Sequence, residues 1–218
     1  MKDSIRRKLD KFERQEAFMI DNAVDFPAGT PGNTTAEVNR LIVGELNTLA
    51  AAQVSGGSSA AAAIGNKDDD LDEIYAMMRN MNRAANAFEA EEPGSNLKFR
   101  LPRNRSGQNI LATARAYYTD SETLEAKFIE YGLDARFRNN LQTLITSIDQ
   151  KNAQADTSLE QRAGATGGLI DAARRGMENS RRMDAIVRIK YADNPQKLAA
   201  WTVASHLERA QKKTPPTP

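Results

Sequence analysis

The sequence predicts an all-α protein, an antiparallel helical bundle built from two duplicated long helical hairpins plus short flanking helices. Alanine occurs 33 times and valine only six times in the 218 residues, a composition that favours helix over strand. Apolar residues recur at spacings of three and four, as on the buried face of a helix. Short segments rich in glycine and proline separate these stretches, so we expect several helices joined by turns.

The N-terminal half is expected to contain three helices. The first runs from about residue 3 to 25 and ends at the segment 26–32, where two prolines and two glycines cannot continue a helix. A second helix follows and is interrupted by the Ser-Gly-Gly-Ser-Ser turn at 55–59. The third begins near Asp68, where acidic residues complement the helix dipole, and extends to Phe88. The second and third helices form the first hairpin.

The rest of the chain continues this alternation of helices and turns. In order, it is expected to contain a short helix capped by Ser106, a helix from about 120 to Gly132, the second hairpin with its turn at 152–168, and a last helix from Asn194. Gly132 suits a left-handed cap at the end of a helix. Asn194 and Pro195 are typical of an N-cap and the first helical position.

An internal duplication is expected to relate the two hairpins. Adding 99 to apolar positions of the first hairpin gives apolar positions of the second: Val38 and Phe137, Ile42 and Leu141, Leu46 and Ile145. Only six of the 51 positions over 38–88 are identical, so the shared apolar phase carries the match. We therefore expect a single helical-bundle domain at 1–213, with pseudo-repeats at about 1–119 and 120–213. A disordered tail is expected at 214–218.

Four stretches of the chain are distinctive. They are Lys98–Ser106 with Asn109–Ala114, Phe128–Leu133, Arg181–Arg188 and Trp201–Arg209. In these stretches the sequence resembles a group of uncharacterised all-helical bacterial proteins of similar length with no assigned activity. The resemblance covers most of residues 1–210 and implies a bacterial origin and a helical fold. It assigns no role to any residue.

The composition removes the residues that several kinds of active site require. The chain has no cysteine and one histidine, His206, so thiolate nucleophiles and zinc sites of histidine and cysteine lack their ligands. The sequence contains no phosphate-binding loop, dinucleotide-binding, nucleophile-elbow or zinc-protease motif. We expect no catalytic residues, no metal site and no cofactor, and favour a protein that is not an enzyme.

Charge and hydropathy favour a soluble cytoplasmic protein. With 30 basic and 29 acidic side chains, the net charge of +1 is not the strongly basic footprint of a nucleic-acid binder. No segment approaches the roughly 20 apolar residues of a membrane span, and the charged N-terminus lacks the apolar centre of a signal peptide. The expected partners are another protein or a second copy of the chain, with no membrane.

A basic loop is the first candidate binding site. Four cations and a helix cap lie within nine residues: Lys98, Arg100, Arg103, Arg105 and Ser106. Guanidinium groups beside a helix N-terminus suit a phosphate or carboxylate, which supports a small-anion or nucleotide-binding function. Alternatively, Phe99 and Leu101 plug the end of the bundle, while the arginines lie in water or pair with the glutamates at 89–92.

A basic stripe is the second candidate. Arg174, Arg181 and Arg188 are seven residues apart and share one face of the helix at 169–191. Such a stripe suits an acidic helix of a partner, or less readily a nucleic-acid backbone.

A polar seam is the third candidate. Ser180 and Asp184 occupy positions where the first copy has Met81 and Ala85. Either they form a polar pocket between the hairpins, or Asp184 forms an ion pair with Arg181 or Arg188 that fixes the helix register. If Asp184 only fixes register, Asp184→Leu is expected to keep the fold with an unchanged or higher melting temperature.

Together these features favour a non-enzymatic helical bundle that acts as a scaffold, a partner-binding module or a self-assembling module. The alternative is a small-anion or nucleotide-binding protein that uses the Arg-rich loop at 98–105.

Overall fold

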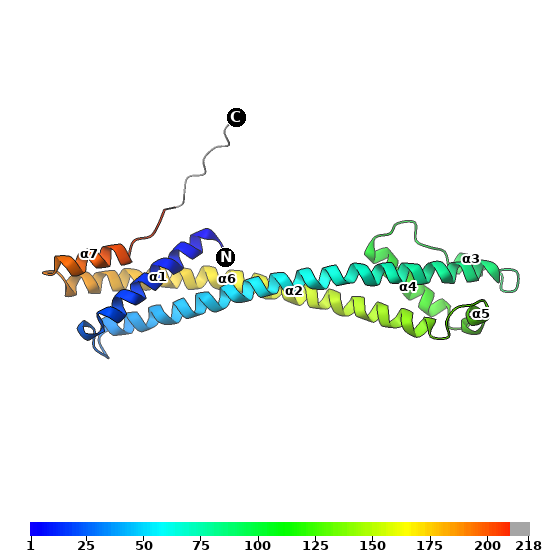
Figure 1. Cartoon of the computed structure of the whole chain (residues 1–218), viewed down its shortest axis with the longest axis horizontal. Coiled ribbons are helices and arrows are strands. Elements are labelled where there is room, and N and C mark those ends of the chain that lie inside the picture. The colour runs from blue at the N-terminus through cyan, green and yellow to red at the C-terminus, as the bar shows by residue number, and fades with distance from the viewer. Residues whose placement is uncertain (210–218) are drawn as a thin grey trace, which may run out of the picture. The chain divides into compact units, whose positions relative to one another are not determined.

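The computed structural model describes residues 1–209, apart from the side chain of Asn66. Every regular element in this range is a helix, so the all-α prediction is confirmed (Figure 1). The helices are α1 (Asp3–Asp21), a 3₁₀ helix (Ala23–Asp25), α2 (Pro31–Ala87), α3 (Ser95–Lys98), α4 (Gly107–Asp120), α5 (Glu125–Glu130), α6 (Phe137–Lys190) and α7 (Pro195–Ala204). The tail predicted at 214–218 lies outside the described residues.

The two predicted hairpin turns are wrong, and with them the two duplicated hairpins. Helix α2 continues for 57 residues through the stretch at 55–59, and α6 continues for 54 residues through 152–168. Neither stretch contains proline. Glycine keeps its backbone hydrogen bonds and costs a helix only about 1 kcal/mol relative to alanine, so neighbouring alanines and packing outweigh it. Each predicted hairpin is therefore one long helix.

The predicted helix ends are confirmed where they depend on local chemistry. The Oγ atom of Ser106 accepts a hydrogen bond from the backbone N–H of Asn109, and the side chain of Asn194 caps α7 in the same way. Gly132 has φ of 94°, the left-handed conformation expected after α5. These ends are set by residues within one turn, which is why the sequence alone locates them.

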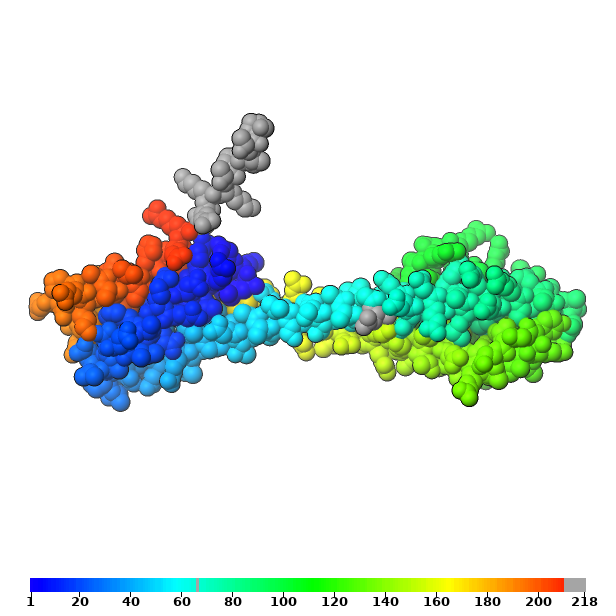
Figure 2. Space-filling view, in the orientation of Figure 1, coloured from blue at the N-terminus to red at the C-terminus, as the bar shows by residue number. Residues whose placement is uncertain are grey.

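Residues Met1–Gly56 and the described residues from Glu160 onward form one compact unit, here called unit 1. Helix α1 packs against the first part of α2 and the last part of α6, and the space-filling view shows α1 in blue lying over α2 (Figure 2). A second cluster holds α7 in place, because the fully buried Trp201 packs on Phe18 with ring centroids 5.1 Å apart.

Residues Gly57–Leu159 form the second compact unit, unit 2. Its core is one cluster that joins the last part of α2, helices α4 and α5, and the first part of α6. Aromatic rings meet edge-on in its centre, with the ring centroid of Phe128 4.8 Å from that of Phe99 and 5.1 Å from that of Phe88. Rings at these distances add to the stabilisation from buried area.

The predicted duplication stays a prediction. Burial agrees in phase at two of the paired positions, since Ile42 and Leu141, and likewise Leu46 and Ile145, are buried. It disagrees at a third, because Val38 is 39% exposed and Phe137 only 4%. The proposed single domain with repeats at 1–119 and 120–213 also stays a prediction. Each compact unit combines segments from both proposed repeats.

Candidate functional site

The Arg-rich loop is anchored by a buried phenylalanine. Phe99 is fully buried, and its ring lies 5.1 Å from that of Tyr117. The Nδ2 atom of Asn82 donates a hydrogen bond of 2.7 Å to the carbonyl oxygen of Phe99. The predicted plug is therefore confirmed for Phe99, whereas the arginines of the loop are exposed.

The cations of this loop differ in the contacts that they form. The guanidinium of Arg105 stacks on the ring of Tyr75 at 4.4 Å. Within residues 1–209, Lys98, Arg100 and Arg103 form no ion pair. The hydroxyl of Ser106 already accepts from a backbone N–H of α4, so it serves as the helix cap.

Of the two placements predicted for these arginines, exposure to water agrees with the structure for Arg100 and Arg103, whereas pairing with the glutamates at 89–92 is not found among residues 1–209. Glu89 instead accepts hydrogen bonds from the backbone N–H groups of Asn96 and Gly94, and these bonds hold the pKa of its carboxyl below the usual range. Glu91 accepts from Lys127 and the hydroxyl of Tyr131. Both carboxylates therefore hold the turns around α3 and α5 in place.

The basic stripe on α6 is partly neutralised by its own helix. Arg174 forms ion pairs of 2.7 Å with Asp171 and 2.8 Å with Glu178. Arg188 pairs with Asp184 at 3.0 Å, whereas Arg181 forms no ion pair among residues 1–209. Two of the three stripe arginines therefore meet a carboxylate on the same helix, which weakens the attraction for an acidic partner.

The polar seam holds α1, α6 and α7 in register. The hydroxyl of Ser180 is 2% exposed and accepts a hydrogen bond of 2.9 Å from Nε2 of Gln15 on α1. Asp184 accepts from Nε of Arg188 at 3.0 Å and from Nε1 of Trp201 at 2.8 Å. Burial favours the neutral acid, but the hydrogen bonds from Arg188 and Trp201 outweigh it and hold the pKa of Asp184 below its usual value.

Two amide side chains and one amine of unit 1 are buried although the sequence did not predict it. Gln15 and Asn39 are fully buried, and the Nδ2 atom of Asn39 donates to the carbonyl oxygen of Phe12 at 2.8 Å. Lys11 is 9% exposed, and burial lowers its pKa. Gln15 lies three residues after Phe12 on the apolar stripe of α1, and that spacing is the signal that identifies it as inward-facing.

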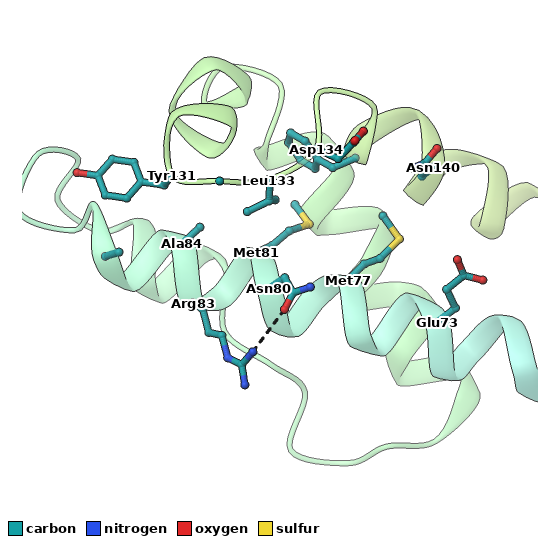
Figure 3. A pocket seen from close by; sticks show the side chains of 13 residues that line it. Glu73, Met77, Asn80, Met81, Arg83, Ala84, Tyr131, Leu133, Asp134 and Asn140 are labelled. Atoms are coloured by element: carbon teal, nitrogen blue, oxygen red, sulfur yellow. Dashed lines mark hydrogen bonds between the residues drawn. The ribbon is translucent and has the colours of Figure 1, made fainter.

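A groove lies on unit 2, and both polar and apolar residues line it. Its volume is about 530 Å³. One side is the last part of α2, and the other is the segment that joins α5 to α6, together with the start of α6 (Figure 3). It is lined by Glu73, Met77, Asn80, Met81, Arg83, Ala84, Ala87, Tyr131, Gly132, Leu133, Asp134, Phe137 and Asn140.

The floor of this groove is apolar and its rim is polar. Met81, Ala84 and Phe137 are buried beneath it, whereas Met77 and Leu133 are half-buried and face the opening. Both Met77 and Met81 line the groove, Met81 from the buried core and Met77 from a half-buried position. Methionine and leucine side chains here offer an apolar, adaptable surface.

The wall opposite α2 is fixed by its turn. The left-handed Gly132 reverses the chain after α5 and brings Leu133 and Asp134 over the groove. The backbone N–H of Leu133 donates to the carbonyl oxygen of Phe128 at 3.0 Å, which closes the helix end. The groove wall is thus part of a hydrogen-bonded turn.

This groove is not predictable from the sequence. Its two sides come from residues 73–87 and 131–140, which are far apart in the chain. Gly132 is the one sequence feature that indicates part of the groove, because a left-handed cap forces a sharp turn next to the apolar Leu133. No sequence pattern shows that this turn lies opposite Met77.

Among residues 1–209, no group of three or more histidine, aspartate and glutamate side chains is arranged to hold a metal ion. In the same part of the chain, no helix has both the length and the apolar character that crossing a bilayer requires. No family model matches the chain, and neither a curated protein nor a solved structure does. The resemblance to helical bacterial proteins therefore stays a prediction.

Proposed function

We propose that the protein is a non-enzymatic, partner-binding helical module, and that the groove of unit 2 receives a segment of another protein. The observation that carries this proposal is the groove itself, about 530 Å³ in volume, with the half-buried side chains of Met77 and Leu133 between polar rims. An apolar floor gives affinity, while polar groups at the rim give orientation.

The contacts elsewhere in the molecule support this proposal. The polar side chains of unit 1 bind one another across α1, α6 and α7, as in the Gln15–Ser180 and Trp201–Asp184 hydrogen bonds. The helices that carry the groove are held by a continuous core beneath it. We place the protein in a bacterial cytoplasm as part of the same proposal, because a chain without cysteine suits a reducing compartment.

The small-anion or nucleotide-binding alternative receives less support. It requires Arg100, Arg103 and Arg105 to converge, but Arg105 stacks on Tyr75. The hydroxyl of Ser106 also takes up one of the N–H donors that an anion needs.

A matched pair of cysteine variants tests the proposal. Because the chain has no cysteine, Ala87→Cys on the groove and Ala200→Cys on α7 each give one labelling position, and both residues are exposed. A photoreactive benzophenone is attached to each, and the labelled proteins are irradiated in extract of the cells that make the protein.

We expect discrete adducts from position 87, with none of the same mass from position 200. Addition of an unlabelled Ala87→Trp variant, in which indole fills the groove, should leave the adducts in place, whereas unlabelled wild-type protein should compete them away. Adducts of twice the chain mass, with a dimer in light scattering, would assign the groove to self-association. Equal labelling at both positions would contradict the proposal.

A further inference from the structure

Resting on the proposed function above, we infer that the segment bound in the groove is basic and amphipathic, with its cationic end at Glu73 and Asp134. The inference comes from the charges around the groove. Of its three charged lining residues, two are carboxylates, Glu73 and Asp134, and one is the guanidinium of Arg83. These charges are not distributed evenly around the opening.

The two carboxylates and an amide lie around the half-buried side chain of Met77. Figure 3 shows Glu73, Asp134 and Asn140 at the same end of the groove, on either side of Met77. Within residues 1–209, Glu73 forms neither an ion pair nor a hydrogen bond through its side chain. Asp134 uses Oδ1 to accept from the backbone N–H of Arg136 at 2.7 Å, and this bond does not neutralise its charge.

The guanidinium of Arg83 does not neutralise this end of the groove. Among residues 1–209, it donates one hydrogen bond of 3.5 Å to Oδ1 of Asn80, which lies one turn earlier on α2, and it forms no ion pair. Figure 3 shows Arg83 directed away from Leu133 and Asp134. A negative potential therefore stays over the Met77 end.

A lysine or arginine side chain of a partner matches both the apolar side chain of Met77 and the two carboxylates. Its methylene stem covers the thioether of Met77, and its charged head reaches the carboxylates in water. An acidic segment would instead place like charges together, which disfavours binding. The lining of α2 from Glu73 to Ala87 corresponds to about 21 Å of helix at 1.5 Å per residue, so a helical partner of about four turns fits its length.

The test is an unbiased selection of peptides. A library of random peptides about 14 residues long, matching that length, is displayed on phage and selected on the full-length protein. The affinity of each recovered peptide is then measured by fluorescence polarisation. The proteins compared are the wild type, Ala87→Trp, and a double charge reversal of Glu73→Lys with Asp134→Lys.

Two controls keep the result specific. Glu13→Lys with Glu122→Lys changes the net charge equally at exposed positions outside the groove. Glu73→Lys alone changes one exposed helix position and leaves the α6 start intact. Circular dichroism checks that each variant is folded.

We expect recovered peptides that combine lysine or arginine with leucine, phenylalanine or methionine. Their affinity should fall about tenfold in the double reversal and about threefold in Glu73→Lys, with less effect at higher salt. The control reversal should change it by less than about twofold.

Two other outcomes separate the inference from the proposed function. Neutral or acidic peptides that lose binding in Ala87→Trp, but not in the double reversal, would overturn the inference and leave the groove as the binding site. Peptides that bind Ala87→Trp as well as the wild type, or no recovered peptides at all, would overturn both.

Discussion

Both units have apolar cores, but buried polar side chains also join the helices of unit 1, whereas the centre of unit 2 is a set of aromatic rings that meet edge-on. Gln15 and Ser180 bond across α1 and α6 in unit 1, and Asp184 holds Trp201 of α7. In unit 2, Phe128 alone contacts three other aromatic rings. Polar pairs specify which side chains face one another, and aromatic packing mainly supplies stability.

This difference indicates where binding is possible. In unit 1 the amide N–H groups of Gln15 and Asn39 and the hydroxyl of Ser180 are bonded to the protein itself. Unit 2 has an apolar core that closes beneath α2 and still leaves Met77, Leu133 and two carboxylates at the surface. We therefore propose that partner binding belongs to unit 2, whereas the polar contacts of unit 1 fix its helices against one another.

The largest expected effect is loss of the aromatic centre of unit 2. Phe128→Ala removes a fully buried ring and should destabilise the protein by about 3–5 kcal/mol, since the surrounding rings cannot close the cavity. Urea unfolding measures the loss, and hydrogen exchange should show it first in residues 57–159. Ile129→Ala is the control, because Ile129 is 39% exposed. Equal losses in both variants would contradict the aromatic core.

A tight contact in unit 1 gives the next effect. A Cβ atom at Gly176 would lie 2.4 Å from Cε2 of the fully buried Phe12. Gly176→Ala should therefore destabilise the protein by about 2 kcal/mol despite the better helix propensity of alanine. Gly167→Ala on the same helix meets no atom within 4 Å and should stabilise by up to about 1 kcal/mol. Thermal unfolding of both variants gives the comparison, and a stable Gly176→Ala would show that α1 packs loosely.

Substitution of Asp184 in the polar seam is expected to have a smaller effect on stability. The expected direction for Asp184→Leu differs from the one that the sequence predicts. Asp184→Leu leaves the indole N–H of the buried Trp201 without its acceptor, so stability should fall by about 1–2 kcal/mol rather than stay unchanged. Asp184→Asn keeps an acceptor oxygen and should lose less. Melting temperatures of the two variants measure the difference. A more stable Asp184→Leu would restore the view that the residue only fixes register.

The smallest effect is a dependence on pH. Because the folded pKa of Asp184 is below the unfolded value, its contribution is complete above about pH 4 and is lost as the pH falls through the folded pKa. The stability difference between wild type and Asp184→Asn should therefore shrink on acidification. Urea midpoints at about pH 6 and about pH 3 measure it. A difference that grows at low pH would contradict the assigned hydrogen bonds.

The sequence predicted features set by neighbours along the chain better than features set across it. The caps at Ser106, Gly132 and Asn194 are confirmed, because each depends on residues within one turn. The two hairpin turns are wrong, because glycine and serine without proline only weaken a helix and packing decides the outcome.

The candidate sites show the same limit. The Arg188 partner of Asp184 was within helical reach and is confirmed, whereas Trp201 comes from another helix and was missed. The groove joins residues 73–87 to residues 131–140, so only the folded chain reveals it.

The most direct test of the division between the two units is hydrogen exchange on the wild-type protein, with and without a peptide recovered from the library. The structure predicts slower exchange at residues 73–87 and 131–140, which line the groove, and unchanged exchange in α1 and α7. Protection confined to residues 1–56 or 160–209 would place binding in unit 1 and contradict the assignment.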